Sequence, residues 1–149
     1  MTDVVSYLCV DGASDALEWY ARALGAEELY RLAMPDGRVG HAEMSIGGTR
    51  LMLSDEWPEG GVLGPKSRGG TTVSFAVTVD DVDALHAMWQ RAVDAGATVE
   101  RQPADQFYGY RAGTLLDPFG HRWTINAKLE DVDPAEMQRR IEATDGAEV

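Results

Sequence analysis

The stretch that decides the fold is Gly113-Thr-Leu-Leu-Asp-Pro-Phe-Gly-His-Arg-Trp-Thr-Ile-Asn126. It predicts a strand, a tight turn over residues 117–120 and a returning strand, because Asp-Pro starts turns and Gly120 lets the backbone reverse direction. A looser copy of this hairpin spans residues 41–54. Aligning Gly48 with Gly120 pairs three further positions, namely Arg50 with Arg122, Leu51 with Trp123 and Leu53 with Ile125. A hairpin that occurs twice indicates an internal repeat.

The sequence before each hairpin supports the repeat. In the second unit, residues 72–79 alternate polar and apolar side chains, as a half-buried strand does. Residues 82–93 then carry apolar side chains at helical spacing, with Asp81 or Asp83 as the cap, and residues 98–102 form a strand. The second hairpin therefore closes a β-α-β-β-β unit.

The first unit shows the same order. We predict a strand over residues 4–10, a helix from Ser14 as its N-cap to Gly25, and a strand over 27–32 before the first hairpin. The repeat predicts an α+β fold of two βαβββ modules in tandem. Its predicted parts are a first module at 1–57, a linker loop at 58–71, a second module at 72–128, and a C-terminal helix and tail at 129–149. We expect Asp133 to cap that helix and the residues from Thr144 to fray.

Composition narrows the class of protein. The chain has 149 residues, of which 44% are hydrophobic and 26% charged, which is typical of a globular domain. Its formal net charge of -12 argues against nucleic acid as a partner, because phosphate contacts need clustered Lys and Arg. No apolar run approaches the length of a membrane span. The single cysteine, Cys9, cannot form an internal disulfide and has no basic neighbour, so we predict an inert buried thiol in a cytoplasmic protein.

Paired modules that carry Trp19-Tyr20, Leu24-Gly-Ala26 and Asp117-Pro-Phe-Gly-His-Arg-Trp123 resemble the vicinal oxygen chelate superfamily. That group holds glyoxalase I, fosfomycin and bleomycin resistance proteins and extradiol dioxygenases. Three stretches, at residues 36–43, 51–56 and 105–111, are similar to its PhnB-like branch. The resemblance implies a curved mixed sheet around a cavity, helices on the convex face, and a homodimer.

The resemblance also raises the question of a metal. Metal-using members of the superfamily place His, Gln or Glu on the first and last strands of each module. The matching positions here fall near residues 5–7 and at Met52, Ser74 and Thr124, and none of them is His, Asp or Glu. Met, Ser and Thr bind hard or borderline divalent ions poorly. We therefore predict no metal site and no cofactor.

Strand alternation leaves His41 and Glu43 pointing the same way, into the expected cavity. Three interpretations stay open. The pair could be a hydrogen-bonded lining of the cavity, or acid-base catalysts together with Tyr110, or metal ligands completed by Asp55 or His121. The last needs a convergence that the sequence does not show, because Asp55 alternates onto the other face and His121 follows the turn at the rim of its hairpin.

Aromatic side chains in the predicted loops indicate an organic ligand, since flat rings and tyrosine hydroxyls suit such sites. The alternative is that they seal a dimer interface or the mouth of the cavity. The predicted ligand-binding residues are His41, Glu43, Met52, Trp57, Ser74, Tyr108, Tyr110, Arg122 and Thr124. We predict a metal-free binding protein for a cationic or aromatic small molecule, such as a drug or metabolite. The alternatives are a metal-dependent lyase, isomerase or dioxygenase, and a metal-free acid-base enzyme.

Overall fold

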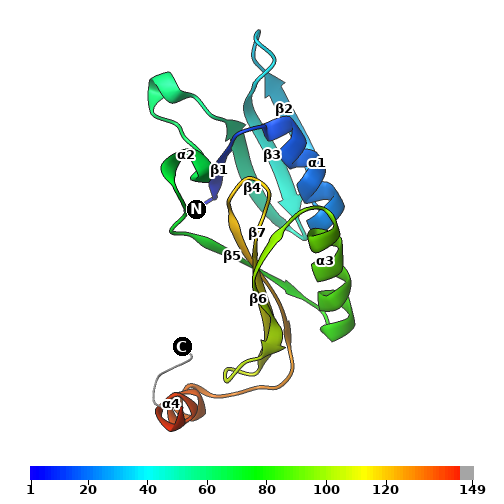
Figure 1. The fold of residues 1–149 in the computed structure, drawn as a ribbon, viewed down its shortest axis with the longest axis vertical. Coiled ribbons are helices and arrows are strands. Elements are labelled where there is room, and N and C mark those ends of the chain that lie inside the picture. The colour runs from blue at the N-terminus through cyan, green and yellow to red at the C-terminus, as the bar shows by residue number, and fades with distance from the viewer. Residues whose placement is uncertain (145–149) are drawn as a thin grey trace.

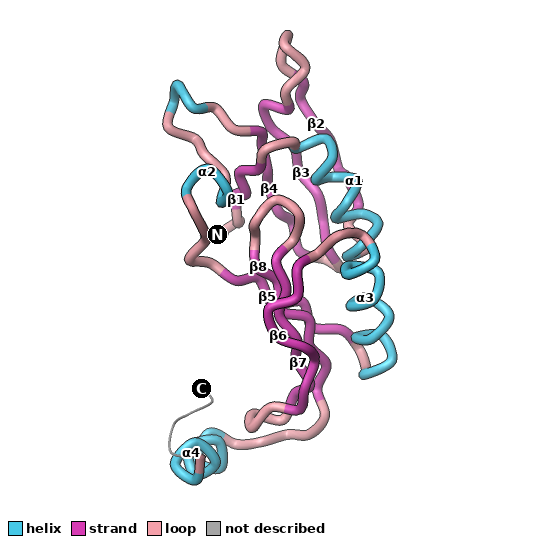
Figure 2. Tube along the Cα trace, viewed as in Figure 1, coloured by secondary structure: helices cyan, strands magenta, loops and turns pink. Residues whose placement is uncertain are grey.

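The computed structural model describes residues 1–144 (Figures 1 and 2). The first module contains β1 (Tyr7–Val10), α1 (Ala13–Leu24), β2 (Glu27–Ala33), β3 (Val39–Ile46) and β4 (Thr49–Asp55). The second contains β5 (Ser74–Val79), α3 (Val82–Asp94), β6 (Thr98–Asp105), β7 (Tyr110–Leu116) and β8 (Arg122–Lys128). A 3-10 turn, η1 (Pro58–Gly60), and a short helix, α2 (Pro65–Arg68), lie between the modules, and α4 (Pro134–Ala143) follows the second.

Each module forms one four-stranded mixed sheet. The strand orders are β1-β4-β3-β2 and β5-β8-β7-β6. In both sheets the first strand pairs with the last in parallel, while the hairpin strands pair antiparallel. The identical topology confirms the predicted repeat and the α+β class. The hairpin of residues 113–126 forms as expected, with Gly120 at a φ of 93° between β7 and β8.

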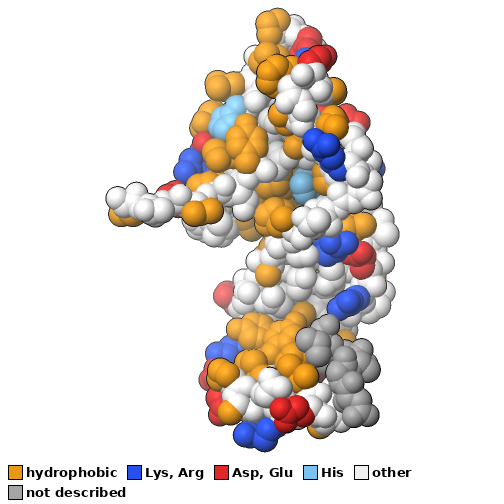
Figure 3. All heavy atoms as spheres, turned by 90° about the vertical axis from the view of Figure 1, so that its left-hand side faces the viewer, with side chains coloured by type: hydrophobic (Ala, Val, Ile, Leu, Met, Phe, Trp, Pro, Cys, Tyr) orange, Lys and Arg blue, Asp and Glu red, His pale blue; other side chains and the backbone are white. Residues whose placement is uncertain are grey.

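The core lies between the sheets and the two long helices, which pack against each other on one side of the molecule (Figure 1). Alternation predicted the core-facing strand residues correctly, since Met44, Leu53, Trp123 and Ile125 are all fully buried. The opposite side of the sheets is not covered by helices α1 and α3, and we call it the open face. It carries exposed large side chains in the first module, namely Tyr7, Tyr30, Leu32 and Met34. Figure 3 shows hydrophobic and histidine side chains gathered on this side of the molecule.

Among residues 1–144, three side-chain hydrogen bonds tie the modules together. Trp19 Nε1 donates to the carbonyl oxygen of Ala95 at 2.9 Å, and Tyr20 Oη donates to Asp117 Oδ2 at 2.6 Å. His121 Nε2 lies 2.9 Å from the carbonyl oxygen of Cys9. His121 therefore lies directly after the turn, at the end of its hairpin as predicted, and this end of the hairpin is buried at the junction of the modules.

Some local predictions also need correction. The N-cap of α1 is Gly12 rather than Ser14, because the carboxylate of Asp55 takes the role of the capping side chain. The segment 58–71 is not a plain linker, since η1 and α2 form within it after Pro58 and Pro65. The first strand begins at Tyr7 rather than at residue 4.

The caps predicted from aspartates hold. Asp81 accepts from the Ala84 N–H at 2.8 Å at the start of α3, and Asp133 accepts from the Glu136 N–H at 2.8 Å at the start of α4. The fraying expected beyond Thr144 concerns residues 145–149, which lie outside the described residues.

Candidate functional site

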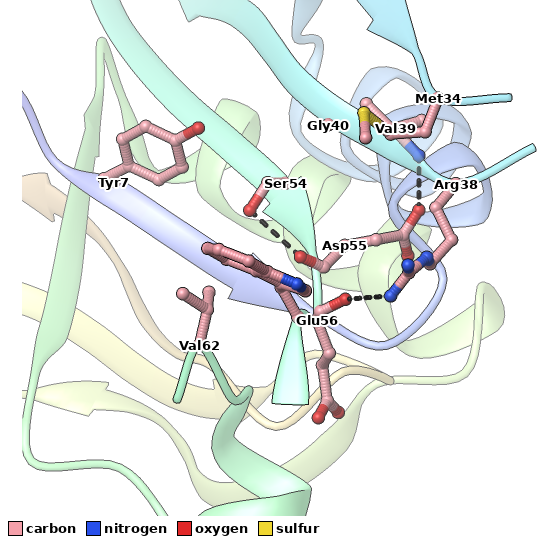
Figure 4. A pocket seen from close by; sticks show the side chains of 10 residues that line it. Tyr7, Met34, Arg38, Val39, Gly40, Ser54, Asp55, Glu56 and Val62 are labelled. Carbon is pink, nitrogen blue, oxygen red and sulfur yellow. Dashed lines mark hydrogen bonds between the residues drawn. The ribbon is translucent and has the colours of Figure 1, made fainter. Parts of the chain in front are cut away.

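A pocket of about 480 Å³ opens at the end of the first sheet, where β1, β3 and β4 meet the loop after β4 (Figure 4). Most of its wall is apolar. The polar side chains at its edge are those of Arg38, Ser54, Asp55 and Glu56. The remaining lining residues are Tyr7, Met34, Val39, Gly40, Trp57 and Val62. A mostly apolar hollow with a few polar groups is the form that small-molecule sites usually take.

The most conspicuous wall of the pocket is Trp57, whose residue surface is 56% exposed. The backbone N–H of Trp57 donates to the carbonyl oxygen of Val62 at 2.8 Å. The backbone N–H of Val62 donates in turn to the carbonyl oxygen of Trp57 at 3.0 Å. Gly60 lies directly beneath the indole, because a Cβ there would come within 2.3 Å of the ring. The loop thus holds a large aromatic face against solvent, where it contributes nothing to the core.

Asp55 fixes the floor of the pocket. Its carboxylate accepts from the backbone N–H groups of Gly12 and Ala13, at the start of α1, and of Val39, at the start of β3. The three distances are 2.9, 2.8 and 2.7 Å. Asp55 points toward the helix, as alternation predicted, and its oxygens are fully engaged by the backbone.

The polar pair singled out from the sequence lies beside the pocket, on the open face of β3. His41 Nδ1 is 2.6 Å from the hydroxyl of Tyr7 on β1, and His41 Nε2 is 3.4 Å from Glu43 Oε1. Glu43 also accepts from the Tyr30 hydroxyl at 3.1 Å and from Arg50 Nη1 at 3.1 and 3.2 Å. His41 and Glu43 are therefore members of a larger hydrogen-bonded network across the sheet.

The network keeps Glu43 in its charged form. Burial by itself would raise the pKa of this carboxyl, but hydrogen bonds from Arg50, His41 and Tyr30 outweigh it, so the pKa lies below its usual value. Any stability that Glu43 gains from these partners is present at neutral pH. It is lost as the pH falls through the lowered pKa.

The predicted site residues of the second module lie elsewhere. Ser74, Arg122 and Thr124 line a separate polar hollow on the open face of β5 and β8. Arg122 Nε pairs there with Glu100 at 2.6 Å, and Thr124 shares a hydrogen bond of 3.1 Å with Thr114. Polar side chains thus face the open side of both sheets, but the two hollows are distinct within the chain.

The predicted loop tyrosines form a third group, although Tyr110 is the first residue of β7 and not part of the loop. The Tyr108 ring lies 5.2 Å from Phe107 and 5.8 Å from Tyr110. The loop between β6 and β7 also contacts α4 and the segment that precedes it. Arg140, on α4, donates to the Phe107 carbonyl oxygen at 2.8 Å, and the backbone N–H of Leu129 donates to the Gly109 carbonyl oxygen at 2.8 Å. α4 lies at the far tip of the second sheet, away from α1 and α3 (Figure 1).

The sequence predicts Trp57, His41, Glu43 and Met52 as ligand-binding residues. Of these, Trp57 lines the pocket, while Met52 is the register partner of both Tyr7 and Glu43. The sequence-based prediction missed Tyr7, Met34 and Val62 as pocket and network residues. For Tyr7 a signal existed, because it falls within residues 5–7, where the superfamily places a ligand. Met34 and Val62 lie in loops, and no sequence pattern predicts where these loops run relative to the sheet.

Comparison with known proteins decides the family. The model of the Glyoxalase/Bleomycin resistance protein/Dioxygenase superfamily matches residues 3–125. The chain belongs to this superfamily. An uncharacterised protein of Mycobacterium tuberculosis is 42% identical over 135 residues, which cover 89% of this chain and 78% of that protein.

Solved structures of other proteins agree in fold. Protein PA1353 of Pseudomonas aeruginosa has a TM-score of 0.73 at 22% identity, and the match covers 87% of this chain and 100% of that one. A PhnB protein of Bacillus cereus has a TM-score of 0.68 at 16% identity, with 85% and 99% covered. Likeness at such identities shows a shared fold and does not extend to activity.

The residues at the metal positions of the superfamily do not suit a metal ion. The resemblance implies that these positions fall near residues 5–7 and at Met52, Ser74 and Thr124, and none of them is His, Asp or Glu. Within residues 1–144, no three His, Cys, Asp or Glu side chains converge as a metal site requires. His41 and Glu43 come close, but their ligand atoms already bond to Tyr7, Tyr30 and Arg50.

Cys9 is partly buried, whereas the sequence predicts a buried thiol. Burial, followed by the nearby carboxylates of Glu56, Asp55 and Asp11, raises the pKa of its thiol from 9.0 to about 11. The folded protein therefore holds this proton to higher pH than the unfolded chain. The associated stability is present below pH 9 and is lost as the pH rises toward about 11.

We expect Cys9 in the native protein to react with a disulfide reagent at pH 8 roughly 100-fold more slowly than in the denatured chain, because the thiolate is the reactive form. The measurement is the rate of thiol labelling with and without guanidinium chloride. Labelling rates within a fewfold of each other would contradict the raised pKa.

Across residues 1–144, the helices are all too short or too polar to cross a membrane.

Proposed function

We propose that the protein binds a flat organic molecule in the pocket at Trp57 without a metal ion. The observation that carries this proposal is the half-exposed indole, which the Trp57–Val62 loop holds over an apolar hollow. Burial of such a ring under a ligand releases water from a large apolar surface. Sequestration or sensing of a drug or metabolite in the cytoplasm is the form of this function that we favour.

A cationic ligand is favoured over an anionic one. The chain carries a formal net charge of -12, and the charged residues that line the pocket are two carboxylates, Asp55 and Glu56, and one cation, Arg38. An aromatic face also attracts cations through its quadrupole. We therefore expect affinity to fall in the order proflavine, 2-tetralone, 2-naphthoate, which are a cationic, a neutral and an anionic flat molecule.

Replacing Trp57 with alanine should weaken proflavine binding about tenfold to 100-fold, since the ring supplies both stacking area and a cation–π contact. The measurement is the rise in melting temperature with ligand concentration, which follows from binding to the native state alone. Leu29→Ala is the matched control, because Leu29 is similarly exposed on β2 but does not line the pocket. Equal loss in both variants, or none in either, would contradict the assignment of the site.

We further propose that two copies pair through their open faces. The support is the row of exposed large side chains on the first sheet and the separation of the predicted ligand-binding residues into distinct hollows. Several large apolar side chains exposed together on one face commonly mark a protein–protein interface. Sedimentation of the full chain at micromolar concentration tests the pairing, and a monomer at all concentrations would contradict it.

A further inference from the structure

Three side chains on the open face form a hydrogen-bonded series that ends at the pocket. Tyr7, on β1, lines the pocket and bonds to His41, and His41 in turn faces Glu43 two residues along β3. Figure 4 shows the Tyr7 ring beside Ser54 at the pocket wall. Core packing does not require this arrangement, since Tyr7 is 50% exposed.

The chemistry of the groups fixes where the protons lie. The lowered pKa of Glu43 keeps it a carboxylate, which only accepts hydrogen bonds. His41 Nε2, which faces that carboxylate, must therefore carry the N–H, and Nδ1 must carry the lone pair. The Tyr7 hydroxyl then donates to Nδ1 at 2.6 Å, and among residues 1–144 its oxygen accepts no hydrogen bond.

We propose that Tyr7, His41 and Glu43 form a metal-free proton relay, which moves a proton next to a carbonyl group in the bound molecule. Tyr7 is the catalytic residue, because it lines the pocket, whereas His41 and Glu43 act through it as positioning residues. This inference rests on the proposed binding function of the Trp57 pocket. It replaces Tyr110, the tyrosine suggested by the sequence, which is the first residue of β7 in the second module and packs beside Tyr108.

The step balances without a co-reactant. As the substrate carbon loses its proton to the Tyr7 oxygen, the Tyr7 hydroxyl proton passes to His41 Nδ1. The electron pair of the C–H bond stays on the substrate as an enolate, and the imidazole becomes an imidazolium beside the Glu43 carboxylate. The reverse transfers return a proton to the same carbon or to a neighbouring one, so the outcome is exchange, racemisation or isomerisation.

The groups around His41 suit this role. Tyr7 faces it from β1, Tyr30 from β2 with ring centroids 5.7 Å apart, and Glu43 from its own strand. Arg50, on β4, bonds to Glu43 rather than to His41, so the carboxylate is held in place while the imidazole gains charge. The apolar walls nearby suit a flat molecule that carries a ketone group as the substrate class.

The test uses the full chain and 2-tetralone, a flat ketone whose benzylic α-protons exchange slowly in buffer alone. Proton NMR in D2O follows that exchange with the parent protein, Tyr7→Phe and His41→Gln. We expect the parent to accelerate exchange above buffer, and each variant to lose about 100-fold of the protein-dependent rate. The melting-temperature shift caused by 2-tetralone should be retained in both variants.

The controls separate the relay from the pocket. His86→Gln, at an exposed histidine of α3, should leave exchange unchanged, while Trp57→Ala should lose exchange and the melting-temperature shift together. Loss of the shift in Trp57→Ala with normal exchange would overturn the relay, as would exchange at the buffer rate by a parent protein that binds 2-tetralone.

A second measurement needs no ligand. Nitrogen-15 NMR of histidine-labelled protein at neutral pH should show His41 protonated at Nε2, with an Nδ1 resonance that moves in Tyr7→Phe. A proton on Nδ1, or an Nδ1 resonance that Tyr7→Phe leaves in place, would overturn the relay. This result stands even if 2-tetralone fails to bind, so failure of the pocket and failure of the relay are distinguishable.

Discussion

Replacing Asp117 with alanine is expected to destabilise the protein by about 3–5 kcal/mol, because the substitution leaves buried hydrogen-bond donors without an acceptor. Asp117 is 3% exposed. Its Oδ2 accepts from Tyr20 Oη at 2.6 Å and from Trp123 Nε1 at 2.8 Å. Its Oδ1 accepts from the N–H groups of Phe119 and His121 at 2.9 and 3.0 Å. The measurement is urea unfolding followed by fluorescence.

The matched variants of this prediction separate the turn from the contact between modules. Tyr20→Phe removes one donor and should cost about 1.5–3 kcal/mol, as for hydrogen bonds to charged groups. Burial raises the pKa of Tyr20 well above its usual value, and the negative charge of Asp117 and the hydrogen bond to it raise this pKa further. The Tyr20 hydroxyl therefore remains a donor. Asp117→Asn should also destabilise, because its amide would face two donors. Unfolding free energies within about 1 kcal/mol of the parent would contradict this account.

Much of the fold follows from local pattern. The turn at Asp117–Gly120, the alternation in β5 and the aspartate caps of α3 and α4 depend on neighbouring residues, and each is predicted correctly. The repeat then supplies the topology, because two units of the same order have the same strand pairing. Features that depend on local sequence are therefore accessible from the sequence alone.

The rest depends on residues far apart in the chain. The Tyr20–Asp117 contact joins positions 97 residues apart, and Asp55 reaches the start of α1 from 43 residues away. No periodicity encodes such pairs, which is why local pattern points to Ser14 as the cap of α1. Part of the proposed relay can be predicted from the sequence, because His41 and Glu43 lie two residues apart on one strand face. Its tyrosine cannot, because Tyr7 reaches His41 from β1 through the pairing of strands in the sheet.

Replacing Asp55 with alanine should cost about 2–4 kcal/mol in the free energy of unfolding and should also weaken the pocket. One carboxylate caps α1 through two backbone N–H groups and holds β3 through a third. A cap alone is worth about 1 kcal/mol, and each buried donor left without a partner adds to that. The measurements are denaturant unfolding and proflavine binding. Asp80→Ala, at an exposed aspartate, should change stability by less than about 0.5 kcal/mol.

The variant Asp55→Asn tests whether Asp55 acts as a cap or as a joint between elements. An asparagine at this position would be a good helix cap, since its oxygen could still accept from Gly12 and Ala13. Its amide nitrogen, however, would face the Val39 N–H, donor against donor. If the role is capping alone, the variant is nearly neutral. If the carboxylate joins α1 to β3, the variant loses stability and proflavine affinity together, because Val39 and Asp55 both line the pocket.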